Sequence, residues 1–226
     1  MKTMDIKQLH TQIDQTQYML NQSRQNLDEM KKAVENLLES EDIFTGEAAE
    51  SVRTFYRETH LPLQQYVLDM IDNYDLNLRK IRMNLYQIEP SDTGWIDEEF
   101  LRRDMEQSLK KAGNVTMSLT DSVNRSLSSI RDIVSIPNLD DQEFHENIRR
   151  SRKHVLDTVD KMYDFDQNAS NILDNQYGDI KNVNKYMSEL NGLLVNRDIS
   201  VGTYEAKQLF HYEFHQEFID RLKRQG

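Results

Sequence analysis

The sequence predicts an all-α protein, with an elongated antiparallel helical hairpin followed by further long, coiled-coil-like helices. Its 226 residues include only seven glycines and three prolines, too few for the frequent turns of an all-β or α/β protein. Hydrophobic residues make up 37% and charged residues 30%, with a mean hydropathy of −0.78, which is typical of helices that expose most of their faces. Apolar residues also recur three and four positions apart along most of the chain.

The first predicted domain, residues 1–89, is the helical hairpin. A heptad repeat predicts one helix over residues 5–40, with its apolar positions at Ile6, Ile13, Leu20, Leu27 and Val34. The apolar rhythm resumes after a turn at 44–46 and continues to Glu89, with a kink expected at Pro62. Because the connection is short, the two helices should lie antiparallel. We expect Gly46 to adopt a left-handed backbone that ends the first helix.

The second predicted domain, residues 90–226, contains three helices separated by polar breaks. The breaks are 90-PSDTGWIDEE-99, 135-SIPNLDDQEF-144 and 196-NRDISVG-202. They predict helices at about 97–135, 140–195 and 203–223.

Three acidic residues and one tryptophan stand out within these breaks. Asp97 is placed to cap the helix that follows it, and Asp140 or Asp141 is placed to cap the next one. Trp95, the sole tryptophan, is expected to pack as a plug between the two halves of the chain.

The charge and composition exclude several classes of function. A net charge of −11 disfavours nucleic acid and anionic lipid surfaces as partners. The chain has no cysteine, so it has no disulfide, thiolate metal site or cysteine nucleophile. The N-terminus lacks the apolar core of a cleavable signal peptide, and no run of 18 apolar residues predicts a membrane span.

Catalytic motifs are absent from the sequence, which predicts that the protein is not an enzyme and needs no cofactor or metal. His211 and His215 stand four residues apart, a spacing that can place two ligands on one helix face, but a metal site needs a third ligand. The segment HYEFH differs from the HExxH of zinc proteases because Glu213 is misplaced. No P-loop, GxGxxG or GxSxG occurs.

Two regions are predicted to need a partner. The third helix carries a seam rich in alanine, serine and threonine, which buries little apolar area by itself. The C-terminal tail concentrates aromatic residues. The candidate docking residues are Val115, Leu119 and Val123 on the third helix, and Tyr204, Phe210, Tyr212, Phe214 and Phe218 in the tail.

The hairpin turn carries a family resemblance. Phe44-Thr45-Gly46, an aromatic-x-Gly between two heptad helices, resembles the W-x-G secretion family. Together with it, three blocks in order resemble the LXG family across essentially the whole chain: 1-MKTMDIKQLHTQIDQT-16, 41-EDIFTGEAAESVRTFYRETHLPL-63 and 131-RDIVSIPNLDDQEF-144. Phe44 stands where the family's name would put leucine, which is a conservative departure.

The resemblance implies a function. LXG proteins are antibacterial toxins of Gram-positive bacteria, whose helical N-terminal domain directs export by the type VII secretion machinery. The expected partners are small helical, W-x-G-like targeting proteins, with an immunity protein for the toxin. The chain would be cytoplasmic before export and then secreted or at the cell surface. It stops about where such a domain would end, so we expect the C-terminal toxin domain to be absent from it.

The heptads also fit a different class of protein. A structural coiled coil that self-associates, as a scaffold or stalk, would show the same apolar spacing. Light scattering separates the two interpretations, because a scaffold forms a defined homo-oligomer without a partner.

Overall fold

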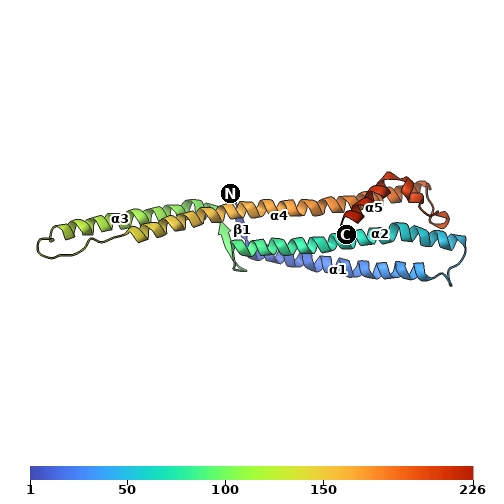
Figure 1. Ribbon diagram of the computed structural model, residues 1–226, viewed down its shortest axis with the longest axis horizontal. Helices are drawn as coiled ribbons and strands as arrows, with labels where there is room; N and C mark the ends of the chain where they lie inside the picture. The colour runs from blue at the N-terminus through green and yellow to red at the C-terminus, as the bar shows by residue number, and fades with distance from the viewer. Residues whose placement is uncertain (226) are drawn as a thin grey trace. The chain divides into compact units, whose positions relative to one another are not determined.

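The computed structural model describes residues 1–225 and confirms the all-α fold class, with one short strand pair added to the helices (Figure 1). The long helices are α1 (Ile6–Glu39), α2 (Glu47–Ile88), α3 (Glu106–Ser128), α4 (Gln142–Asn196) and α5 (Glu213–Gln225). The short elements are strands β1 (Thr3–Asp5) and β2 (Trp95–Asp97), a π-helical turn η1 (Phe100–Met105), and the 3₁₀ turns η2 (Val201–Thr203) and η3 (Gln208–His211). α2 continues through Pro62 without ending there.

The chain divides into two compact units that are discontinuous in sequence. Unit 1 comprises residues 1–9 and 84–168, and unit 2 comprises residues 10–83 together with residues 169 onward. This division differs from the predicted one at residue 90. Long helices explain the difference, because α1, α2 and α4 each contribute one part to each unit.

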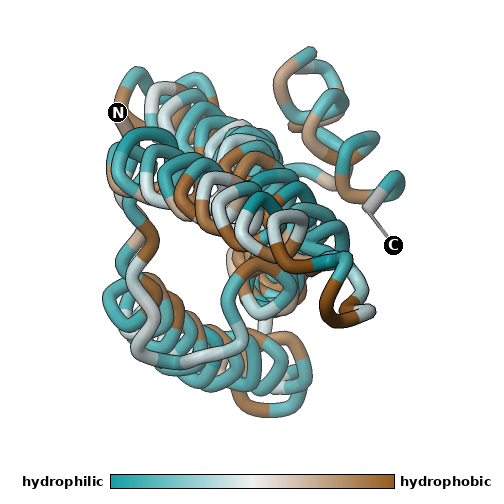
Figure 2. The backbone as a smooth tube through the Cα atoms, turned by 90° about the vertical axis from the view of Figure 1, so that its left-hand side faces the viewer, coloured by the Kyte–Doolittle hydropathy of each residue, from teal (hydrophilic) through white to brown (hydrophobic). Residues whose placement is uncertain are grey.

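Unit 2 contains the greater part of the predicted helical hairpin. Side chains link α1 to α2 in antiparallel order: Gln17 donates a hydrogen bond to Asp75 at 2.6 Å, and Lys31 donates one to Gln65 at 3.2 Å. The heptad residues Ile13 and Val34 are buried. In Figure 2, hydrophobic and hydrophilic stretches follow one another along the helices, as expected where apolar residues recur every three or four positions.

The C-terminal tail also belongs to unit 2, and it is less helical than predicted. α5 begins only at Glu213, and two 3₁₀ turns precede it. Lys207 has a φ of 65°, a left-handed conformation that interrupts an α-helix. The Tyr204 hydroxyl accepts a hydrogen bond from the backbone N–H of Leu209, which folds the segment back on itself.

Unit 1 is organised around a two-stranded antiparallel ribbon that the sequence analysis missed. β1 pairs with β2 in the register Thr3–Asp97, Met4–Ile96 and Asp5–Trp95. A small core lies beneath the ribbon, formed by Met4, Ile6, Leu85, Ile96 and Met162. Trp95 is exposed in β2, so the expectation that it forms a buried plug was wrong.

The rest of unit 1 is an antiparallel pair formed by α3 and the first part of α4 (Figure 1). Arg152 on α4 forms an ion pair with Glu106 on α3, and Gly113 faces the ring of His145. α3 ends at Ser128, seven residues before the predicted end at 135. At this end the backbone tightens, because the N–H groups of Ser129 and Ile130 donate to the carbonyls three residues earlier, those of Ser126 and Leu127.

The predicted helix caps are present. Asp97 accepts a hydrogen bond from the backbone N–H of Phe100 at 2.9 Å, and Asp140 accepts one from that of Gln142 at 2.9 Å. The backbone carbonyl of Asp141 accepts a hydrogen bond from the N–H of His145 at the start of α4. Asp97 directly precedes the helical stretch that starts at Glu98 and continues through η1 into α3, and Asp140 lies just before α4.

Candidate functional site

The hairpin turn, residues 40–46, presents the Phe44-Thr45-Gly46 motif at its surface. Phe44 is partly exposed, and Ile43 beside it is 90% exposed. Gly46 has a φ of 98°, so the expected left-handed backbone is present. Its place differs from the expectation, because α1 ends at Glu39 and Gly46 lies directly before α2, where its carbonyl accepts the N–H of Glu50. Gly46 therefore starts the second helix of the hairpin.

A buried arginine holds this turn. Arg53 is only 5% exposed, and its Nη1 donates a hydrogen bond to the carbonyl oxygen of Phe44 at 2.6 Å. Its Nη2 donates to Glu50 at 2.8 Å, and the same hydrogen-bonded contact lowers the pKa of Glu50. The guanidinium carbon also lies 6.0 Å from the centre of the Phe44 ring, within cation–π range. No sequence pattern indicates Arg53, because its role depends on a contact nine residues away.

The three candidate docking residues of α3 lie together on its exposed side. Leu119 is 62% exposed, and Val115 and Val123 are exposed as well. Gly113 and Thr120, by contrast, are the buried positions of this helix. Because Val115, Leu119 and Val123 are spaced four residues apart, they form one apolar stripe along the helix. We call these three residues the α3 stripe.

The aromatic tail is placed differently from the docking surface that its composition predicted. Tyr204 and Phe218 are buried in the core of unit 2, and Tyr212 and Phe214 are partly buried against it. Phe218 stacks on Tyr186 with ring centres 4.1 Å apart, and the Tyr204 hydroxyl donates to Glu58 at 2.7 Å. Within the tail candidates, Phe210 alone is classed as exposed. Tyr204, Tyr212, Phe214 and Phe218, which were expected to contact a partner, therefore pack within unit 2 instead.

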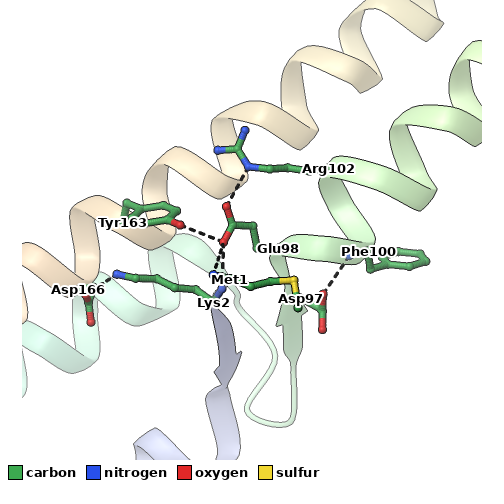
Figure 3. A network of polar contacts seen from close by, with 8 residues as sticks. All are labelled: Met1, Lys2, Asp97, Glu98, Phe100, Arg102, Tyr163 and Asp166. Carbon is green, nitrogen blue, oxygen red and sulfur yellow. Dashed lines mark hydrogen bonds and ion pairs between the residues drawn. The ribbon is translucent and has the colours of Figure 1, made fainter.

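A polar network fastens the β1–β2 ribbon to α4 within unit 1 (Figure 3). The carboxylate of Glu98 accepts hydrogen bonds from the backbone N–H of Lys2, the Tyr163 hydroxyl and the Arg102 guanidinium, each at 2.9 Å. These bonds, led by that of Lys2, lower the pKa of Glu98. The Lys2 ammonium pairs with Asp166 and lies 4.4 Å from the centre of the Tyr163 ring. The network joins Lys2 and Glu98, which flank the two strands, to α4.

The histidine pair does not share a regular helix. His211 ends η3 and is exposed, whereas His215 lies on α5 and is fully buried. Burial lowers the pKa of His215, and its Nδ1 lies 3.1 Å from the Tyr186 hydroxyl. Within residues 1–225, no group of three His, Asp or Glu side chains is arranged to hold a metal ion. No helix in that range is long and apolar enough to cross a bilayer.

Comparison with known proteins identifies relatives of this chain. A family model described as the LXG domain of the WXG superfamily matches residues 2–203. Toxin YxiD of Bacillus subtilis (strain 168) is 32% identical over 206 residues, which cover 91% of this chain. The same alignment covers 36% of Toxin YxiD, so the chain spans about a third of the length of that relative.

Proposed function

Because the chain belongs to the LXG domain family, we propose that it is the secretion-targeting and partner-binding region of an antibacterial toxin. In this proposal, small helical W-x-G-like proteins bind the chain, and the complex is exported by the type VII secretion machinery. The protein would be cytoplasmic before export and secreted or cell-surface afterwards. Its role would be binding without catalysis, and an immunity protein would match a toxin domain elsewhere in the full-length protein.

The observation that carries the proposal is the α3 stripe. α3 packs against α4 on one side through a seam that contains Gly113 and Thr120, and these residues bury little apolar area. On its other side, Val115, Leu119 and Val123 remain exposed. An amphipathic helix from a partner can cover this stripe with residues at matching i, i+4 spacing. Such a partner would bury apolar surface that α3 leaves in water.

The binding test uses the α3 stripe and a matched leucine. The chain is co-expressed with the small helical proteins encoded beside its gene, and complex formation is followed by size-exclusion chromatography with light scattering. Leu119→Ser should weaken the complex at least about tenfold, because it removes the most exposed side chain of the stripe. Leu76→Ser, at an exposed leucine on α2, is the control and should bind as the wild type does.

Two results would contradict the proposal. A wild-type chain that remains a stable monomer and forms no complex with these proteins would overturn partner binding. A defined homo-oligomer that ignores them would instead support the self-associating scaffold. In the second case, Leu119→Ser should dissociate the homo-oligomer, since the same stripe would join the copies.

A further inference from the structure

The loop that joins α3 to α4 exposes an unusual number of aliphatic side chains. Residues 129–141 include five large aliphatic residues, all classed as exposed: Ile130, Ile133, Val134, Ile136 and Leu139. Ile133 is 79% exposed, the highest value of the five. Surface loops are normally polar, and a group of exposed apolar side chains marks an interaction site. We call this segment the α3–α4 loop.

Side chains hold the α3–α4 loop in a defined conformation. The amide of Asn124 makes two hydrogen bonds with the backbone of Leu139: Nδ2 donates to its carbonyl at 2.9 Å, and Oδ1 accepts from its N–H at 2.7 Å. Arg131 also bonds to Asn138, and the N–H groups of Ile133 and Val134 donate to the carbonyl of Ile130. A preorganised loop loses less conformational entropy when it binds a partner. The aliphatic side chains of this loop therefore form a preorganised binding surface.

The charge around the α3–α4 loop indicates what kind of partner fits it. From residue 129 to 146 there are five acidic residues and one basic residue, Arg131; the acids are Asp132, Asp140, Asp141, Glu143 and Glu146. Arginines become frequent only from Arg149 onward. Acidic loops of two copies would repel each other, and an anionic lipid surface would repel them as well. The complementary surface is an apolar pocket with lysine or arginine side chains at its rim.

We propose that the α3–α4 loop inserts its aliphatic side chains into an apolar, basic-rimmed pocket on the small helical partner protein. This inference rests on the proposed function, which supplies the partner, and it adds a second contact outside the α3 stripe. The aliphatic side chains provide the buried centre of the contact, and Asp132 and Glu143 pair with the basic rim. Two contacts on one partner bind together more tightly than either does alone.

The first test changes the aliphatic centre. Dissociation constants for the co-expressed helical partner are measured for the wild type, Ile133→Asp and the control Val195→Asp, which changes an exposed aliphatic residue of α4. Both variants should fold, because both side chains are exposed, and circular dichroism checks this. Ile133→Asp should bind roughly tenfold more weakly or worse, whereas Val195→Asp should match the wild type. Equal affinity for all three would overturn the inference and leave the proposed function standing.

The second test changes the charge. Asp132→Lys combined with Glu143→Lys should weaken binding several-fold and reverse its salt dependence, because opposite charges become like charges. Asp174→Lys combined with Glu189→Lys, at exposed acids of α4, is the control and should leave the salt dependence unchanged. If the variant that combines Asp132→Lys and Glu143→Lys binds as the control variant does, the inference of a basic rim on the partner is wrong. If the wild-type chain forms no complex with the partner, the proposed function falls, and this inference falls with it.

Discussion

Arg53 on α2 donates a hydrogen bond from its Nη1 to the carbonyl oxygen of Phe44, nine residues earlier in the chain. The bond spans the hairpin turn and fixes the residue that precedes Thr45 and Gly46. Arg53 is almost completely buried, so its charge needs the partners that it finds in Glu50 and the Phe44 carbonyl. The exposed motif therefore depends on a residue that lies outside it.

We expect Arg53→Met to destabilise the protein by about 2 kcal/mol. The substitution keeps much of the side-chain volume but leaves the Phe44 carbonyl without its charged donor. Arg57→Met is the control, because Arg57 is half exposed and lies 3.9 Å from the same Glu50, so it should change stability by no more than about 0.5 kcal/mol. Urea denaturation followed by circular dichroism measures both. Equal losses would mean that Arg53 acts only through surface charge.

Phe44 itself is expected to act in recognition rather than in folding. Under the proposed function, Phe44→Ala should reduce export of the full-length protein while leaving the thermal melting of this chain nearly unchanged, since the ring is partly exposed. Ile43→Ala is the control, because Ile43 is the more exposed neighbour in the same turn. The measurement is the amount of the full-length protein in culture supernatant relative to cells. Normal secretion of Phe44→Ala would leave the motif with a structural role alone.

Gly46 has a backbone conformation that a residue with a side chain adopts only at a cost in stability. A Cβ at this position would meet no atom within 4 Å, so crowding is not the obstacle. The positive φ of 98° is the obstacle, and we expect Gly46→Ala to cost about 1–2 kcal/mol. Gly178→Ala, in open space within α4, should have the opposite sign and stabilise by roughly 0.5–1 kcal/mol. Equal shifts in the urea midpoint would contradict the backbone explanation.

The hairpin could be predicted because its signal is long and periodic. Ile6, Ile13 and Val34 are buried as their heptad spacing requires, and the break after Glu89 is where α2 has ended. The left-handed conformation of Gly46 was also predictable from residue type. Its position relative to α1 was not, because the six residues between Glu39 and Gly46 carry no clear stop signal.

The missed features depend on contacts between distant residues. Strands β1 and β2 are three residues each, too short for an alternating pattern to be recognised. The sequence pattern of the tail predicts a helix from residue 203 onward. Lys207 instead adopts a positive φ, which a lysine at this position gives no reason to expect. The Asn124 side chain that braces Leu139 acts across 15 residues. Such pairings have no local sequence signature.

Glu98 should make the stability of unit 1 depend on pH. Three donors stabilise its ionised form in the folded protein, from Lys2, Tyr163 and Arg102, so its folded-state pKa lies below the ordinary value of 4.5. Stability from this group is therefore present above about pH 4.5 and is lost as the pH falls through the lower folded-state pKa. Glu98→Gln resembles the protonated form at every pH.

The melting temperature of Glu98→Gln should thus lie below that of the wild type at neutral pH, and the gap should close in acid. The gap closes because the Glu98 carboxylate of the wild type becomes protonated in acid, whereas the variant has no carboxylate at this position. Glu99→Gln is the control, since Glu99 forms a partly exposed pair with Arg103 one turn along the helix, and it should leave the melting temperature nearly unchanged. A gap that stayed constant from neutral pH into acid would show that Glu98 stabilises the ribbon through shape and not through its charge.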